Sequence, residues 1–102
     1  MTRIELLYFA GCPNHDAFLP HLLQLLRHHE DEGPVQLLEV LDDAQAQRLR
    51  FLGSPSLRVD GRDVEVGSEE RATYGLQCRI YQRADGASGA PPDDWIVAAL
   101  QA

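Results

Sequence analysis

The sequence predicts an α/β protein in which a strand–helix–strand unit precedes a β-hairpin and a C-terminal helix. Apolar runs of strand length at 4–9 and 35–41 flank a helical pattern at about 16–29, so the two strands should be parallel. Alternating apolar residues on both sides of Asp60-Gly61 predict an antiparallel hairpin, because Asp-Gly favours a two-residue turn. With 102 residues, the chain 1–102 is expected to form a single domain with one core.

Composition and charge argue against several kinds of partner. A formal net charge of −7 and a pI near 4.8 would repel nucleic-acid phosphates and anionic lipid. The apolar runs reach only about six residues, against about 20 for a transmembrane helix, and no secretory signal is recognised. We therefore expect a cytoplasmic protein with no nucleic-acid or membrane partner. Four arginines interleaved with acids are expected to form only a solvated mixed surface: Arg48, Arg50, Arg58 and Arg62.

The first strand and first helix have clear burial patterns. The run 6–9 is continuously apolar, which places the strand in the middle of the sheet with both faces buried. Pro20 lies inside the following helix and is expected to kink it, and Gly33-Pro34 should lie beyond its end. The buried face of the helix repeats at helical spacing: Phe18, Leu19, Leu22, Leu23, Leu25 and Leu26.

Local signals also divide the rest of the chain. Asp42 or Asp43 should cap a second helix that ends at Gly53 in a left-handed turn. Residues 67–75 predict a surface loop or short helical turn, residues 84–90 a glycine-rich loop, and Pro91-Pro92-Asp93-Asp94 the start of the last helix. Two alternating patterns predict strands with one buried face, namely Leu57, Val59, Val64 and Val66 in the hairpin and Leu76, Cys78 and Ile80 after it.

Cys12 is the first candidate functional residue, because it stands between the first strand and the first helix. The partial positive charge of a helix N-terminus favours the thiolate, which is both the nucleophile and the metal-binding form of cysteine. Two cysteines are too few for a disulfide framework, so they are expected to be free thiols, a transient redox pair or ligands. The alternative for Cys12 is a small inert residue buried in the turn.

His15 and Cys78 are the two residues that could assist Cys12. His15 follows Cys12 by about one helical turn and could stabilise the thiolate as imidazolium or relay a proton; alternatively it is merely exposed. Cys78 is either a core thiol or a resolving partner of Cys12, and a disulfide would need α-carbons within about 7 Å.

Other polar and aromatic clusters are assigned to structure. His28 and His29 beside three acidic residues are interpreted as a solvated helix end, so no metal or other cofactor is expected. Three aromatic residues could line a groove but are expected to pack in or near the core: Tyr74, Tyr81 and Trp95.

Three local features together resemble the thioredoxin-like family over nearly the whole chain. Cys12-Pro13-Asn14-His15 stands where thioredoxins carry Cys-x-x-Cys, and Pro20 lies eight positions beyond Cys12 (20 − 12), as does the proline that kinks the equivalent helix. Ser54-Pro55 directly before the hairpin looks like the cis-proline signature. The resemblance implies a central mixed sheet flanked by helices. More narrowly, the chain is similar to small bacterial thioredoxin-like proteins, some of which carry labels taken from alkylmercury lyases.

The resemblance also implies a substrate side. Pro55 would be cis and lie beside Cys12, and the backbone of Ser54 would be available to pair with an extended substrate segment. The chain departs from the family at His15, which stands in place of the second cysteine, so exchange within the motif cannot occur.

Three chemistries remain open to Cys12. It could react with a thiol or disulfide of a protein or small molecule and be resolved by Cys78 or an external thiol, act as an oxidant sensor, or capture a soft metal. The leading hypothesis is a thiol–disulfide redox protein. The competing hypothesis is a non-catalytic thioredoxin-like module for protein binding or soft-metal binding.

Overall fold

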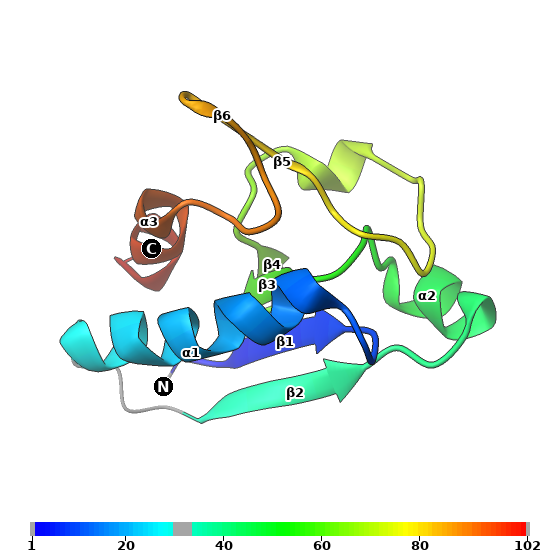
Figure 1. Ribbon diagram of the computed structural model, residues 1–102, viewed down its shortest axis with the longest axis horizontal. Coiled ribbons are helices and arrows are strands. Elements are labelled where there is room, and N and C mark those ends of the chain that lie inside the picture. Colours follow the sequence, from blue (N-terminus) through cyan, green and yellow to red (C-terminus); the bar gives the residue numbers. More distant parts are fainter. Residues whose placement is uncertain (1, 30–33, 102) are drawn as a thin grey trace.

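The computed structural model describes residues 2–29 and 34–101 as a mixed four-stranded sheet flanked by helices (Figure 1). The sheet has the strand order β2-β1-β3-β4, in which β1 is parallel to β2 and antiparallel to β3. The predicted α/β architecture is therefore confirmed. The elements are β1 (Ile4–Tyr8), α1 (Pro13–His28), β2 (Val35–Glu39), α2 (Asp43–Leu49), β3 (Ser56–Val59), β4 (Arg62–Asp63), the 3-10 turn η1 (Ser68–Glu70), β5 (Tyr81–Arg83), β6 (Gly86–Ser88) and α3 (Asp93–Gln101).

β1 is buried on both faces, as its apolar run predicted. Leu6 and Leu7 are both fully buried, and neighbouring residues of a strand point to opposite faces. Leu6 belongs to a cluster that includes Leu22 of α1 and Ile96 of α3, whereas Leu7 packs in a second cluster with Ala46 of α2. Helices therefore cover both faces, and Figure 1 shows α3 and α2 at opposite ends of the molecule.

The helix ends agree only in part with the predictions. α1 begins at Pro13, three residues earlier than expected, because a proline in the first turn lacks only an N–H that would be unpaired there. Asp42 caps α2 as predicted, with its side chain accepting from the Gln45 amide at 2.8 Å. The prediction that Gly53 ends α2 is wrong, because Arg50 takes the left-handed position, with φ +54°. The predicted helix stop at Gly33 lies outside the described residues.

The hairpin has the predicted turn but a shorter second strand. Asp60 and Gly61 both have positive φ, 52° and 84°, as a two-residue hairpin turn of the primed type requires. β4 contains only Arg62–Asp63, and the chain then leaves the sheet. Val64 is still buried, but Val66 is fully exposed, so the prediction of a buried face reaching Val66 is wrong.

The segment after η1 does not bury the residues that were predicted to be buried. Leu76, Cys78 and Ile80 are exposed, while Arg79 and Tyr81 are buried, so both the extra strand at this position and a core Cys78 are wrong predictions. The reason is that the buried Arg79 side chain pairs with the carboxylates of Asp63 and Glu65, as described below. The glycine-rich stretch 84–90 also differs from the expected loop, because 86–88 pairs with β5 as β6.

No helix within 2–29 and 34–101 is long and apolar enough to cross a membrane.

Candidate functional site

Cys12 is the N-cap residue of α1 and is completely buried. Gly11 before it has φ +87°, which a residue without a side chain adopts readily and which turns the chain from β1 into the helix. The Cys12 thiol makes no hydrogen bond to the amides of the first helical turn. Instead its Sγ lies 3.8 Å from the carbonyl oxygen of Ser54, to which it donates. The cysteine is thus directed across the site to the residue that precedes Pro55.

The Ser54-Pro55 bond is cis, as the resemblance implied. Ser54 is fully buried, and its side-chain hydroxyl has no hydrogen-bond partner among the described residues. The Pro55 carbonyl accepts a hydrogen bond from the hydroxyl of Tyr81. The Cys12 thiol therefore contacts the residue before the cis bond, and Tyr81 holds the proline after it.

The backbone of Ser54 is paired with the chain's own residues 73–79, which we call the bridging segment. The Ser54 amide donates to the carbonyl of Gln77 at 2.8 Å, and the Ser54 carbonyl accepts from the amide of Arg79 at 3.1 Å. Together they form a parallel bridge in which Cys78 lies directly opposite Ser54. The expectation that Ser54 is available to a substrate strand therefore needs correction, because both of its backbone groups are engaged.

The bridging segment is tied to residues 51–54 along its length. Its Gly75 amide donates to the Phe51 carbonyl at 3.1 Å. The side-chain amide of Gln77 donates to the carbonyls of Leu52 at 3.1 Å and Thr73 at 2.6 Å. These hydrogen bonds hold the backbone on both sides of Cys78, while the Cys78 side chain itself is exposed.

Gly53 permits this close approach. A Cβ atom at Gly53 would lie 2.9 Å from Cβ of Arg79 and 3.0 Å from the carbonyl oxygen of Gln77, closer than side chains normally come. Its φ of +132° is also a conformation that residues with a side chain rarely adopt. The glycine that was predicted to end α2 therefore leaves the space in which the bridging segment packs.

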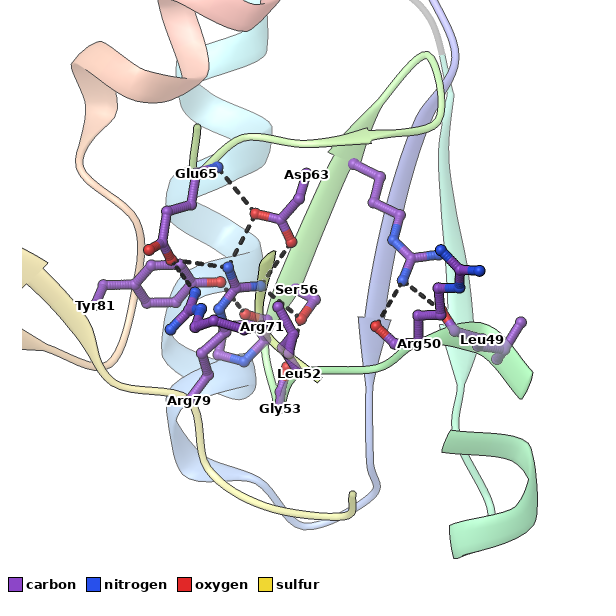
Figure 2. Close-up of polar contacts among 12 residues, drawn as sticks. Leu49, Arg50, Leu52, Gly53, Ser56, Asp63, Glu65, Arg71, Arg79 and Tyr81 are labelled. Atoms are coloured by element: carbon purple, nitrogen blue, oxygen red, sulfur yellow. Dashed lines mark hydrogen bonds and ion pairs between the residues drawn. The ribbon is translucent and has the colours of Figure 1, made fainter. Parts of the chain in front are cut away.

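A buried arginine clamps the end of the bridging segment to the hairpin (Figure 2). The Arg79 guanidinium is 2% exposed and forms a two-point ion pair with Asp63, with N–O distances of 2.7 and 2.9 Å. It also donates to Glu65 at 2.9 Å and to the hydroxyl of Ser56 at 3.0 Å. Figure 2 shows Arg79 between these groups, over the ring of Tyr81, whose centroid is 4.5 Å away. Charge-assisted, two-point contacts of this kind are among the stronger hydrogen bonds in proteins.

Tyr81 completes the clamp. It is fully buried, packs edge-to-face against Trp95 and donates its hydroxyl to the Pro55 carbonyl. Burial is the main cause that raises the pKa of Tyr81 far above its ordinary value, so the hydroxyl remains a donor. The expectation that Tyr81 is a packing residue rather than part of a groove is met.

His15 lies in the first turn of α1 and is 6% exposed. Its ring stacks on Tyr8 of β1 with centroids 3.9 Å apart, and its Nδ1 has no hydrogen-bond partner among the described residues. Burial lowers the pKa of His15, although the nearby Asp16 carboxylate acts in the opposite direction. His15 is therefore a neutral imidazole at pH 7, and an imidazolium at this position would require more acidic conditions.

The lowered pKa of His15 should appear as a loss of stability in acid. The unfolded side chain titrates near its ordinary pKa of about 6.5. As the pH falls through that value, the unfolded state takes up a proton that the folded state resists, so the free energy of unfolding decreases until the folded pKa is reached. Each unit by which the pKa is lowered corresponds to about 1.4 kcal/mol. Replacing His15 by Gln should remove this part of the decrease in urea unfolding measured from pH 8 to 5. A native His15 NMR titration with a midpoint at or above 6.5 would contradict the expectation.

Ser54, which precedes Pro55, is related to both cysteines: its carbonyl accepts from Cys12 and its backbone bridges to Cys78, and both cysteines are free thiols. His15 stacks on Tyr8 and makes no hydrogen bond to Cys12 within the described residues. No group of three or more His, Cys, Asp or Glu side chains in 2–29 and 34–101 could hold a metal ion.

Sequence reasoning missed the Arg79 clamp. Arg79 and Tyr81 alternate with the apolar Leu76 and Ile80, and the apolar set was assigned to the core. The signal that could have revealed the clamp is the pair of acids in the hairpin, Asp63 and Glu65. They are two residues apart in a predicted strand, so both side chains point to one face, where an arginine could pair with them.

Comparison with models of known families, with curated proteins and with solved structures found no match for this chain.

Proposed function

We propose that this chain is a thioredoxin-like thiol–disulfide redox protein in which Cys12 is the attacking thiol and Cys78 the resolving thiol. The observation that carries the proposal is that both cysteines contact one residue. Cys12 Sγ hydrogen-bonds to the Ser54 carbonyl, and Cys78 is the bridge partner of Ser54. The strand order β2-β1-β3-β4 and the cis Ser54-Pro55 bond between α2 and β3 agree with the fold that the resemblance implies.

The reaction requires two exchanges of sulfur partners. The Cys12 thiolate attacks a disulfide of a protein or small molecule, forms a mixed disulfide and releases one substrate thiolate, which takes up a proton. The Cys78 thiolate then attacks Cys12 Sγ and releases the second substrate thiol, leaving an internal Cys12–Cys78 disulfide. Two electrons pass from the protein thiols to the substrate, and an external dithiol returns the protein to its reduced state. A reducing compartment such as the cytoplasm supplies such thiols.

Both steps require local movement around Cys12, because its buried thiol must be reached first by the substrate and then by the exposed Cys78. The backbone beside Cys78 is held at Ser54 by two hydrogen bonds, one from the Ser54 amide to the Gln77 carbonyl and one from the Arg79 amide to the Ser54 carbonyl. Because the Ser54 carbonyl also accepts the Cys12 thiol hydrogen bond, a local shift of the bridging segment would be enough to present Cys78 to Cys12, and an intramolecular reaction of this kind is favoured over an external one.

Mass analysis in a glutathione redox buffer tests the proposal. The wild-type protein should lose two hydrogen atoms, and peptide mapping should show a Cys12–Cys78 bridge that dithiothreitol reverses. The Cys78→Ser variant should instead accumulate glutathione on Cys12, because its resolving thiol is missing. The Cys12→Ser variant serves as the control for simple modification of the exposed Cys78.

The contrary outcome is equally definite. If the wild-type protein carries glutathione on Cys78, keeps Cys12 reduced and forms no internal bridge, the redox proposal fails. One copper(I) ion per chain that protects both thiols from alkylation, without a disulfide, would support soft-metal binding instead, since thiolates favour soft metals.

A further inference from the structure

Four arginines surround a hollow between the end of α2 and the residues that follow β4. The hollow has a volume of about 530 Å³ and is lined by Arg50, Arg58, Arg62 and Arg71. The chain has nine arginines, no lysine and a net charge of −7. Three of the four arginines predicted to form a solvated mixed surface, Arg50, Arg58 and Arg62, line this one hollow, whereas Arg48 does not.

The carboxylates of the hollow do not balance these arginines. Asp63 and Glu65 are already paired with the buried Arg79, and Glu65 also with Arg71, so this group is neutral as a whole. The remaining charged lining residues are three arginines and the single acid Glu69, a local excess of two positive charges (3 − 1). Like charges that face one hollow repel each other, and an anion between them removes that cost.

Arg58 is held in a fixed orientation. One of its terminal nitrogens, Nη2, donates to the carbonyl of Leu49 at 2.6 Å and to that of Arg50 at 3.3 Å, at the end of α2. Its Nη1 and Nε donors make no hydrogen bond within the described residues. A guanidinium already fixed in this way loses less freedom when it binds an oxyanion.

Arg50 occupies a position at which an arginine is disfavoured. It follows the last residue of α2 and has a left-handed backbone, with φ +54°, where helices usually carry glycine or asparagine. A side chain in this conformation costs free energy. A non-glycine residue kept under such strain motivates a search for what its side chain does, and Arg50 lines the hollow.

We propose that this hollow binds a small multivalent oxyanion, a phosphate ester or a polycarboxylate, through Arg50, Arg58 and Arg62. Guanidinium groups match the planar, two-point geometry of carboxylate and phosphate oxygens. The volume of about 530 Å³ lies within the roughly 300–1,000 Å³ of small-molecule sites. Neither cysteine lines the hollow, so the proposal does not depend on the thiol chemistry above.

Titration calorimetry of the full chain with inorganic pyrophosphate and with citrate, at constant ionic strength, tests this site. The wild-type protein should bind one anion saturably. Arg50→Gly should weaken binding at least about tenfold, as expected for a lost charge-assisted contact, while the melting temperature without ligand stays equal or rises because the left-handed strain is relieved. Arg48→Ala removes the same charge from an exposed position of α2 outside the hollow and should leave affinity unchanged.

Each outcome decides the proposal. Binding of pyrophosphate alone identifies phosphate esters, binding of citrate alone identifies polycarboxylates, and binding of both identifies the shared chemistry. Absence of saturable binding with either probe overturns the site. It is also overturned if Arg48→Ala weakens binding as much as Arg50→Gly, because attraction would then come from diffuse charge.

Discussion

Replacing Arg79 by methionine is expected to lower the free energy of unfolding by about 3–5 kcal/mol, the usual cost of removing one partner from a buried ion pair. Methionine approximates the aliphatic stem of arginine, but Asp63 would lose its ion-pair partner and Glu65 would retain only Arg71 of its two partners. The hydroxyl of Ser56 would lose a donor, and Tyr81 the cation over its ring. Urea unfolding followed by far-ultraviolet circular dichroism measures the change.

Arg71→Met is the matched control. Arg71 also pairs with Glu65, but its side chain is 41% exposed, and exposed ion pairs contribute only about 0–1 kcal/mol. Arg79→Lys should recover part of the loss, since it restores the charge without the two-point geometry. If Arg79→Met and Arg71→Met destabilise the protein equally, the clamp does not have the importance assigned to it.

The second large effect is expected at Gly53. Gly53→Ala should cost about 2–5 kcal/mol, because it combines a backbone conformation unfavourable for alanine with a steric clash. The new Cβ would lie 2.9 Å from Cβ of Arg79 and 3.0 Å from the Gln77 carbonyl oxygen. Since both neighbours belong to the bridging segment, the segment must shift away from Ser54. Weaker hydrogen-exchange protection of the Ser54 and Arg79 amides would be the direct sign.

Gly67→Ala separates the two contributions. Gly67 also has a positive φ, +88°, but nothing lies within 4 Å of an added Cβ. This variant should show only the conformational cost, about 1–2 kcal/mol, and leave the exchange of the Ser54 and Arg79 amides unchanged. Equal costs for the two glycines would mean that the bridging segment does not pack closely on Gly53.

Local signals were sufficient for the elements whose partners lie nearby in the chain. The continuous apolar run around Leu6 and Leu7 predicted a strand covered on both faces, Asp60-Gly61 predicted the hairpin turn, and Asp42 predicted a helix cap; all three are confirmed. Of the candidate site, the cis bond before Pro55 was implied by the resemblance and is present.

Features that depend on distant partners could not be predicted in this way. Arg79 is buried because it pairs with the carboxylates of Asp63 and Glu65, which lie 16 and 14 residues earlier in the chain. A prediction from hydrophobicity alone places an arginine at the surface. Its burial turns Cys78 outward. In the same way, Gly53 was assigned to a helix end by its neighbours in sequence, whereas its glycine character is needed by a segment more than 20 residues later.

The Ser54–Cys78 bridge places Cys78 beside a residue that also contacts Cys12, although the two cysteines are far apart in the sequence. A disulfide between them would therefore restrict the entropy of the unfolded chain. A bond between Cys12 and Cys78 would enclose 65 residues (78 − 12 − 1), a loop that contains α1, β2, α2, β3, β4 and η1. Closing a loop of this size restricts the denatured chain by about 3–4.7 kcal/mol in the loop-entropy model. The oxidised protein should therefore unfold at a higher urea concentration than the reduced protein. By the same thermodynamic cycle, the folded chain would hold its disulfide against reduction more strongly than the unfolded chain.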